Sequence, residues 1–264
     1  MTAKVLTITS GKGGVGKTTT VANLAVAFAS RNQKVVCIDG DIGLRNLDVI
    51  LGLENRIVYD IVDIVEGRCR TRQAMIRDKR FPDLFLIPAA QTRDKNAVSP
   101  SDMVRLCAEL REVFDWIIID SPAGIERGFK NSIAPADIVA IVTNPEMSAV
   151  RDADRIIGII EAEEKKPPYL IINRIKPSMV DKGNMLSVDD IYELLRIEVI
   201  GVIPEDENVL IASNKGVPLA IDAKTKSGVE FRNIARRFMG EQVPFQDLKE
   251  TNFWNKFNIF GQKD

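Results

Sequence analysis

The segment of this chain best equipped for chemistry is the run SGKGGVGKTTT at positions 10–20. In it Gly11 is followed, after four residues, by Gly16, Lys17 and Thr18, which is the spacing of a phosphate-binding P-loop. Glycines allow successive backbone N–H groups to turn toward phosphate oxygens, and a helix that begins near Lys17 adds the positive end of its dipole. We therefore expect Lys17 to bind the β- and γ-phosphates of a nucleotide and the Thr18 hydroxyl to bind Mg²⁺. The whole expected phosphate site is Gly11, Lys12, Gly13, Gly14, Val15, Gly16, Lys17, Thr18 and Thr19.

Carboxylates follow two apolar runs elsewhere in the chain. Val35–Ile38 leads into Asp39 and Asp41, and the apolar run 116–119 leads into Asp120. An apolar strand that ends in Asp is the Walker B pattern, so Asp120 is expected beside the P-loop, where it would hold Mg²⁺. An Asp after a strand is also a common helix cap or turn former, and this alternative is strongest for Asp39.

Composition excludes several classes of site. The chain has 264 residues, no histidine and three cysteines, Cys37, Cys69 and Cys107, which lie more than 30 residues apart. A Ser-His-Asp triad and His-ligated metals are excluded, and a zinc ribbon, a redox dithiol or a disulfide scaffold is disfavoured. A formal net charge of −1 gives no global field to attract nucleic acid, so no nucleic-acid partner is expected. The apolar runs are too short to cross a bilayer and no leader precedes the first strand, so we expect a cytosolic or stromal protein.

The elements that must position these residues alternate between short apolar runs and longer helical patterns. This alternation predicts a single α/β P-loop NTPase domain over 1–240, with a mostly parallel twisted sheet and helices on both faces. Ligands of such sheets bind beyond the carboxyl ends of the strands. Pro244 is expected to end the helical pattern, giving a linker over 241–252 and a tail over 253–264. The expected strands are Val5–Thr9, Val35–Ile38, Leu84–Pro88, Trp116–Ile119, Ile138–Thr143, Leu170–Asn173 and Val199–Ile203; the expected helices lie near Thr18–Ser30, Ser101–Phe114, Ser148–Glu163 and Val188–Leu195.

The tail carries bulky aromatic side chains at helical spacing. At ~100° per residue, Phe253, Trp254, Phe257 and Phe260 fall within an arc of about 120°, which is typical of an amphipathic helix that enters a membrane interface. One such short helix would bind weakly, whereas two held in a dimer would bind by avidity. A tail that packs back onto the domain is the alternative.

A second lysine, Lys12, lies early in the loop. The resulting GKGGVGKT sequence is a deviant Walker A motif, and it resembles that of the MinD/ParA family of ATPases. The resemblance implies ATP and Mg²⁺ as ligands, an ATP-dependent homodimer in which Lys12 reaches the partner's phosphates, and Asp41 as the group that orients the attacking water. It also implies that Asp39 lies in the outer shell of the metal, and that the GVIPED segment containing Pro204 walls the adenine. Lys12 as a solvated loop lysine and Pro204 as a structural turn remain alternatives.

Base recognition is also expected at Asn173 and Arg174, which end an apolar run. An Asn side chain has a donor and an acceptor that can match the Watson–Crick edge of adenine. The chain has no Asn-Lys-x-Asp guanine motif, so ATP is favoured over GTP.

Within the family, the similarity is greatest to members that determine the division septum site, and it runs from Thr7 to Phe260. It implies membrane lipid and proteins of the MinC and MinE types as partners, a peripheral location on the inner face of the membrane, and a partner surface at Arg151, Asp152 and Asp154. A solvated helix end would explain those three residues equally well. A ParA-type DNA-segregation ATPase, an iron–sulfur carrier of the same superfamily and a nucleotide-gated scaffold are the rival functions. The segments that carry this similarity are Gly43–Asp48, Ser121–Glu126, Asn144–Glu146, Val150–Arg155 and the tail.

Overall fold

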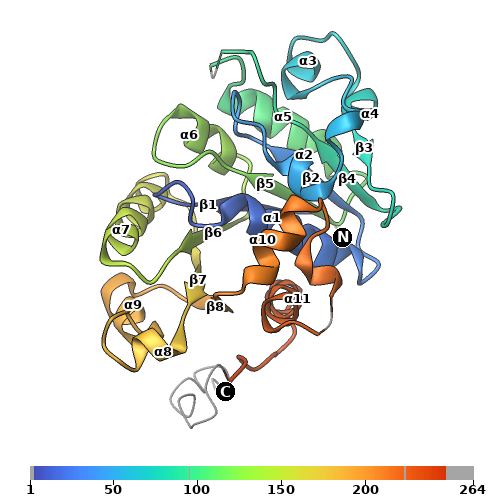
Figure 1. The fold of residues 1–264 in the computed structure, drawn as a ribbon. Helices are drawn as coiled ribbons and strands as arrows, with labels where there is room; N and C mark the ends of the chain where they lie inside the picture. The colour runs from blue at the N-terminus through green and yellow to red at the C-terminus, as the bar shows by residue number, and fades with distance from the viewer. Residues whose placement is uncertain (1–2, 95, 223, 248–264) are drawn as a thin grey trace, which may run out of the picture.

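One sheet organises the molecule (Figure 1). The computed structural model describes residues 3–94, 96–222 and 224–247. Eight strands of the described residues form this sheet in the order β3-β4-β2-β5-β1-β6-β7-β8, and only β3 runs antiparallel to its neighbour. The expected α/β architecture with a mostly parallel sheet is therefore confirmed. The strands are β1 (Lys4–Thr9), β2 (Val35–Asp39), β3 (Ile76–Arg77), β4 (Leu84–Ile87), β5 (Trp116–Asp120), β6 (Ile138–Thr143), β7 (Tyr169–Ile175) and β8 (Val199–Pro204).

Helices cover both faces of the sheet. On one face α1 packs against β1, and α11 packs against α1 and β8, in a cluster that includes Leu6 and Ile8 of β1. On the other face α5 lies in a cluster with Val5 of the same strand. Strands that are buried on both faces must be apolar at successive positions, which is why these runs have no polar alternation. The helices are α1 (Lys17–Ala29), α2 (Leu47–Leu51), α3 (Ile61–Val65), α4 (Thr71–Ala74), α5 (Pro100–Leu110), α6 (Arg127–Ile133), α7 (Met147–Ala162), α8 (Pro177–Val180), α9 (Val188–Leu195), α10 (Glu207–Asn214) and α11 (Lys226–Phe238), with 3-10 turns η1 (Glu54–Arg56) and η2 (Leu219–Ile221).

The expected long elements are present, with small shifts at their ends. Ile138–Thr143 has the expected bounds, whereas the expected strand Leu170–Asn173 continues to Ile175 and begins at Tyr169. The helix expected from Ser101 begins at Pro100, because the Ser99 hydroxyl accepts the Asp102 N–H and caps it. Short elements such as α2, α4, α8 and the two-residue β3 were not expected, since each has too few residues to show a period.

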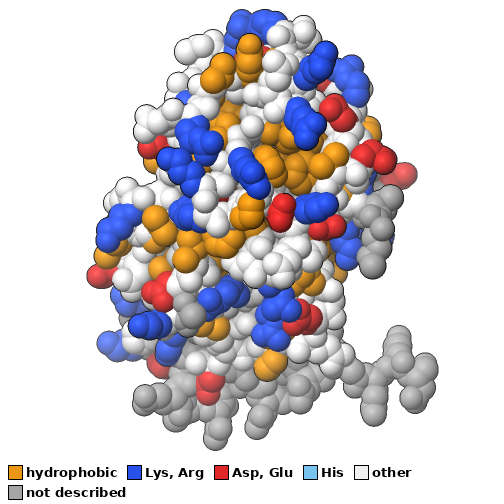
Figure 2. Space-filling model, turned by 90° about the vertical axis from the view of Figure 1, so that its right-hand side faces the viewer, with side chains coloured by type: hydrophobic (Ala, Val, Ile, Leu, Met, Phe, Trp, Pro, Cys, Tyr) orange, Lys and Arg blue, Asp and Glu red, His pale blue; other side chains and the backbone are white. Residues whose placement is uncertain are grey.

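Charged side chains of both signs lie on the surface. On the face shown in Figure 2, basic and acidic side chains surround exposed apolar ones. This mixture agrees with the formal net charge of −1. Among the described helices, none is both long and apolar enough to span a bilayer.

Candidate functional site

The P-loop connects β1 to α1 at the carboxyl edge of the sheet. Gly14 and Gly16 have φ of 79° and 97°, a left-handed backbone that favours glycine. At Gly16 a Cβ would also lie 2.3 Å from Nδ2 of Asn173, so this position has no room for a side chain. Within the described residues no side chain caps the first turn of α1. The N–H groups of that turn are therefore suited to hold an anion.

Lys17 lies in a buried ion pair at the start of α1. Its Nζ lies 2.8 Å from Oδ1 of Asp120, and the two side chains are 9% and 1% exposed. Asp120 ends β5 and is in register with Asp39, the last residue of β2, so the two carboxylates lie side by side. Burial, and next the charge of Asp120, raise the pKa of Asp39 well above its ordinary value. The site therefore contains two acidic side chains, Asp39 and Asp120, and one lysine, so the carboxyl groups outnumber the lysine and leave an excess of negative charge.

A divalent cation fits this excess of negative charge. Mg²⁺ prefers oxygen ligands and is commonly held by one or two carboxylates together with phosphate oxygens and water. Thr18, the residue after Lys17, is partly buried, and its position next to the loop agrees with the expected role as a hydroxyl ligand. Thr18, Asp39 and Asp120 could therefore hold the ion, with most of its other ligands coming from nucleotide and solvent.

Asp39 also organises the segment that follows it. Its carboxylate accepts hydrogen bonds from the backbone N–H of Asp41 at 3.0 Å, Asn46 at 3.3 Å and Leu47 at 3.2 Å. These bonds fold residues 40–46 over the end of β2 and satisfy N–H groups at the start of α2. Asp41 is held by its backbone next to Asp39 and is partly exposed. Asp39 therefore does both: it accepts hydrogen bonds from N–H groups at the start of α2, as in the alternative of a cap, and it lies beside Asp120.

Lys12 extends over the surface toward the start of α7. Its Nζ lies 3.0 Å from Oε2 of Glu146 and 3.2 Å from the hydroxyl of Ser148, and its side chain is 42% exposed. A surface ion pair of this kind contributes ~0.2–1 kcal/mol. Lys12 can therefore leave these partners at little cost.

Asn173 and Pro204 lie at the carboxyl ends of the neighbouring strands β7 and β8. Nδ2 of Asn173 donates to the carbonyl of Val15 at 2.7 Å, so in this structure the amide contacts the P-loop itself. Arg174 is exposed and has a φ of 61°. Pro204 pairs with Ile175 in the ladder, and its carbonyl accepts the Ser227 hydroxyl. The expected base-binding residues thus gather at one edge, next to the P-loop.

Comparison with known proteins agrees with this site. The chain matches the CobQ/CobB/MinD/ParA nucleotide binding domain over residues 6–219. The septum site-determining protein MinD of Bacillus subtilis is 53% identical over 251 residues, which is 94% of each chain, and that of Escherichia coli K12 is 44% identical over 98% of this chain and 99% of the relative. Among solved structures, the MinC:MinD cell division complex of Aquifex aeolicus has a TM-score of 0.87 at 47% identity and covers 93% of this chain and 99% of that chain. The Pyrococcus horikoshii septum site-determining protein, complexed with Mg-ADP, has a TM-score of 0.81 at 25% identity, covering 89% and 96%.

This chain belongs to the MinD family. The family consists of nucleotide-binding P-loop ATPases, so the chain is an ATP hydrolase with a part in septum-site determination. The resemblance inferred from GKGGVGKT is confirmed.

The expected partner surface lies on α7 of this family member. Arg151 and Asp154 are exposed, and Asp152 is partly buried with its carboxylate 3.6 Å from Arg155. The backbone of Asp152 lies so close to the P-loop that a Cβ on Gly11 would come within 2.4 Å of its carbonyl oxygen. The start of α7 therefore packs directly against the nucleotide loop.

Sequence reasoning did not assign three residues near the site. Glu146 and Ser148 form hydrogen bonds with Lys12. Asn144 is buried and is the first residue after β6. In the sequence Asn144 comes directly after an apolar run, as Asp39, Asp120 and Asn173 do. A polar residue after an apolar run could therefore have indicated Asn144 as a site residue. Glu146 lies in a segment that carries the family resemblance, but nothing in the sequence indicated that Glu146 or Ser148 contacts Lys12.

Other expectations concern the cysteines and the tail. Cys37, Cys69 and Cys107 are free thiols. Burial raises the pKa of Cys37 and raises that of Cys107 to about 12, which makes both poor nucleophiles. The expected membrane residues Phe253, Trp254, Phe257 and Phe260 lie outside the described residues.

Proposed function

We propose that this chain is a Mg²⁺-dependent ATPase that dimerises with ATP and then binds the membrane through residues 253–260. The dimer recruits a MinC-type division inhibitor and is released when a MinE-type activator stimulates hydrolysis, which places the division site. The observation that carries the proposal is the pair of lysines in one loop. Lys17 is buried against Asp120, and Lys12 is on the surface in a weak ion pair.

The buried lysine serves the nucleotide bound to its own chain. When a triphosphate occupies the loop, Lys17 exchanges the Asp120 carboxylate for phosphate oxygens, at a site where the N–H groups of α1 already point. Thr18, Asp39 and Asp120 would hold Mg²⁺ beside the loop, and the ion would supply positive charge that neutralises the phosphates. Asp41 orients the attacking water, since the chain has no histidine to do so. We assign the binding of the adenine to Asn173, Arg174 and Pro204.

The surface lysine serves the nucleotide of the second chain. Phosphoryl transfer is accelerated by a cation delivered from outside, as with an arginine finger. Lys12 leaves Glu146 and Ser148 and reaches the partner's phosphates, so a complete site forms only in the dimer. This requirement would couple ATP binding to dimerisation.

The MinC partner is supported by the solved MinC:MinD complex, one chain of which is 47% identical to this chain over 93% of its length. The surface proposed for it is the start of α7, with Arg151, Asp152 and Asp154. Because Gly11 packs on the backbone of Asp152, a partner bound to α7 would contact the element that adjoins the P-loop. We assign the binding site of a MinE-type activator to the same helix. The protein would cycle between the cytoplasm, or a plastid stroma, and the inner face of the membrane.

Vesicle co-sedimentation with ATP, ADP and no nucleotide tests the proposal. The full chain should sediment with ATP and stay largely in solution with ADP, and a chain that ends at residue 252 should not sediment in either. A Lys12→Ala variant should reveal whether a second subunit completes the site, because it should lose turnover. Binding that is equal in all nucleotide states would refute the proposal, and retention on duplex DNA in place of vesicles would favour the ParA-type alternative.

A further inference from the structure

Arg237 contacts three consecutive residues of the segment of chain that leads to the tail. Residues 241–246, which we call the strap, follow α11 and have neither helix nor strand structure. Arg237, in the last turn of α11, donates from Nε to the carbonyl of Val243 at 3.0 Å and from Nη2 to that of Pro244 at 3.0 Å. Its guanidinium also lies 4.2 Å from the centre of the Phe245 ring. The planar fork of arginine, with five donors, suits such a set of acceptors, and a lysine could not reproduce it.

The same arginine is locked to the sheet. Nη1 of Arg237 donates to the carbonyl of Ile200 in β8 at 2.9 Å and to Oε1 of Glu230 at 2.7 Å. The side chains of Arg237 and Glu230 are 9% and 1% exposed, so this ion pair is buried and its geometry is fixed. Gln246, at the far end of the strap, donates to Oε2 of Glu230 at 3.0 Å. Arg237 and Glu230 together thus hold the strap from Val243 to Gln246, whereas its first residue, Glu241, forms separate ion pairs with Arg31 and Arg236.

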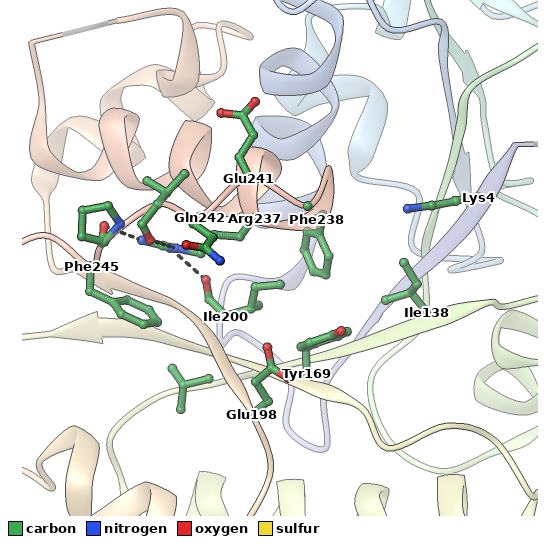
Figure 3. A pocket seen from close by; sticks show the side chains of 14 residues that line it. Lys4, Ile138, Tyr169, Glu198, Ile200, Arg237, Phe238, Glu241, Gln242 and Phe245 are labelled. Carbon is green, nitrogen blue, oxygen red and sulfur yellow. Dashed lines mark hydrogen bonds between the residues drawn. The ribbon is translucent and has the colours of Figure 1, made fainter. Parts of the chain in front are cut away.

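Packing alone would not hold the strap in place. A cavity of ≈ 680 Å³ lies between the strap and the amino ends of the strands, where it is lined by Ile138, Tyr169 and Ile200 among others. Figure 3 shows Arg237 beside this cavity, with Ile200 on one side of Arg237 and Phe245 of the strap on another. The Phe245 ring packs against a core cluster, but the cavity separates other parts of the strap from the strands, so the polar contacts of Arg237 are needed to fix the position of the strap.

We propose that Arg237 is a positioning residue for membrane binding: it fixes the strap, and so fixes the point at which the tail leaves the body. This inference rests on the proposed function of the tail. With the strap fastened through Gln246, the six residues 247–252 separate it from Phe253. Glu241 keeps its ion pairs with Arg31 and Arg236 when the contacts of Arg237 are lost, so the eleven residues 242–252 then separate the body from Phe253. Once one tail of a dimer is inserted, the effective concentration of the second falls as about the −3/2 power of linker length. Loss of the Arg237 contacts therefore lowers that concentration about 2.5-fold.

The test uses the full chain with two independent ways to release the strap. Arg237→Gln is combined with Glu230→Gln, because removal of the arginine alone would leave a buried carboxylate without a counter-charge. Phe245→Ser removes the ring that stacks on Arg237 and leaves the buried pair intact. The comparison variant keeps the strap and carries five inserted Gly and Ser residues after Asp247. Thermal unfolding and lipid-free ATP turnover confirm that each variant is folded.

Binding is measured on vesicles of mixed zwitterionic and anionic phospholipid, titrated with ATP and separately with ADP. Both strap variants and the insertion variant should weaken ATP-dependent binding about 2.5-fold and leave the weaker ADP-state binding unchanged. Strap variants that bind as tightly as the parent would overturn the inference, as would variants that lose binding equally in ADP and ATP. The proposed function fails by a different result, namely that the parent binds equally in both nucleotides or that a chain ending at residue 252 binds as well as the parent.

Discussion

Replacement of the two lysines of the P-loop, Lys12 and Lys17, should have different effects on the stability of the protein and on ATP turnover. Lys12 is 42% exposed and its partner Glu146 is 55% exposed, so removal of this ion pair should cost less than about 1 kcal/mol of unfolding free energy. Lys17 is 9% exposed and pairs with Asp120, which is 1% exposed. Removal of one partner from such a buried pair costs about 3–5 kcal/mol. Lys17→Met should therefore destabilise the nucleotide-free protein strongly, and Lys12→Ala should hardly change it.

ATP turnover should respond differently from stability to the loss of Lys12. A cation supplied across an interface accelerates phosphoryl transfer by about 10³–10⁵-fold, so Lys12→Ala should lose turnover to a similar extent although its fold is intact. Lys130→Ala is the matched control, because Lys130 lies 3.0 Å from Glu163 in an equally exposed pair on another part of the surface. It should match Lys12→Ala in stability and the parent in turnover.

Urea unfolding without nucleotide or Mg²⁺ gives the stability, and phosphate release with ATP, Mg²⁺ and vesicles gives the turnover. Equal losses of stability in Lys12→Ala and Lys17→Met would show that the burial of the two lysines does not set their roles. A Lys12→Ala protein that hydrolyses ATP at the parent rate would refute the assignment of this side chain to the partner's phosphates.

Three further changes have expected outcomes. Asp41→Ala should still form dimers with ATP, measured by size-exclusion chromatography, but should slow hydrolysis because the attacking water is no longer oriented; an unchanged rate would contradict that role. Phe257→Glu should abolish sedimentation with vesicles while the melting temperature stays the same, because it places a charge in the apolar stripe. Asp78→Asn should lower the unfolding free energy by ~1–3 kcal/mol at pH 7. Burial would raise the pKa of Asp78, but hydrogen bonds from Arg80 outweigh it and hold that pKa below 3.8. The stabilising effect is therefore complete above pH 3.8, and the difference between the two proteins should vanish as the pH falls below it, as urea unfolding at several pH values would show.

Local spacing was sufficient to predict the phosphate loop and its carboxylates. Gly11, Gly16 and Lys17 form a motif within one turn and one helix start, so no distant contact is needed to recognise it. Asp39 and Asp120 could be placed together because the carboxyl ends of parallel strands meet at one edge, and the register of β2 with β5 pairs them.

Contacts between distant residues could not be predicted in this way. Glu146, which binds Lys12, lies 134 residues farther along the chain. The short helices α2 and α10 end where Gly52 and Gly216 touch, and a Cβ on either glycine would lie within 2.8 Å of the other. Arg80 then donates to the carbonyls of Leu51 and Gly216, at both helix ends. Such close approaches depend on the packing of the whole chain, and a propensity for helix over five residues does not reveal them.

The arrangement of α1 favours a particular link between nucleotide and membrane. Lys17 begins this helix at the phosphate site, and Arg31, just beyond its end, lies 2.6 Å from Glu241 at the start of the strap. The thirteen residues of α1 span about 20 Å at 1.5 Å per residue, so the two sites lie at opposite ends of one helix. Most of α1 is buried and it packs along α11, which carries Arg237. A close-packed helix cannot slide by a fraction of an ångström without cost to both interfaces, so phosphate contacts at one end do not readily loosen the strap at the other. In the proposed cycle, nucleotide is therefore better suited to act on membrane binding by bringing two tails together than by releasing a single one.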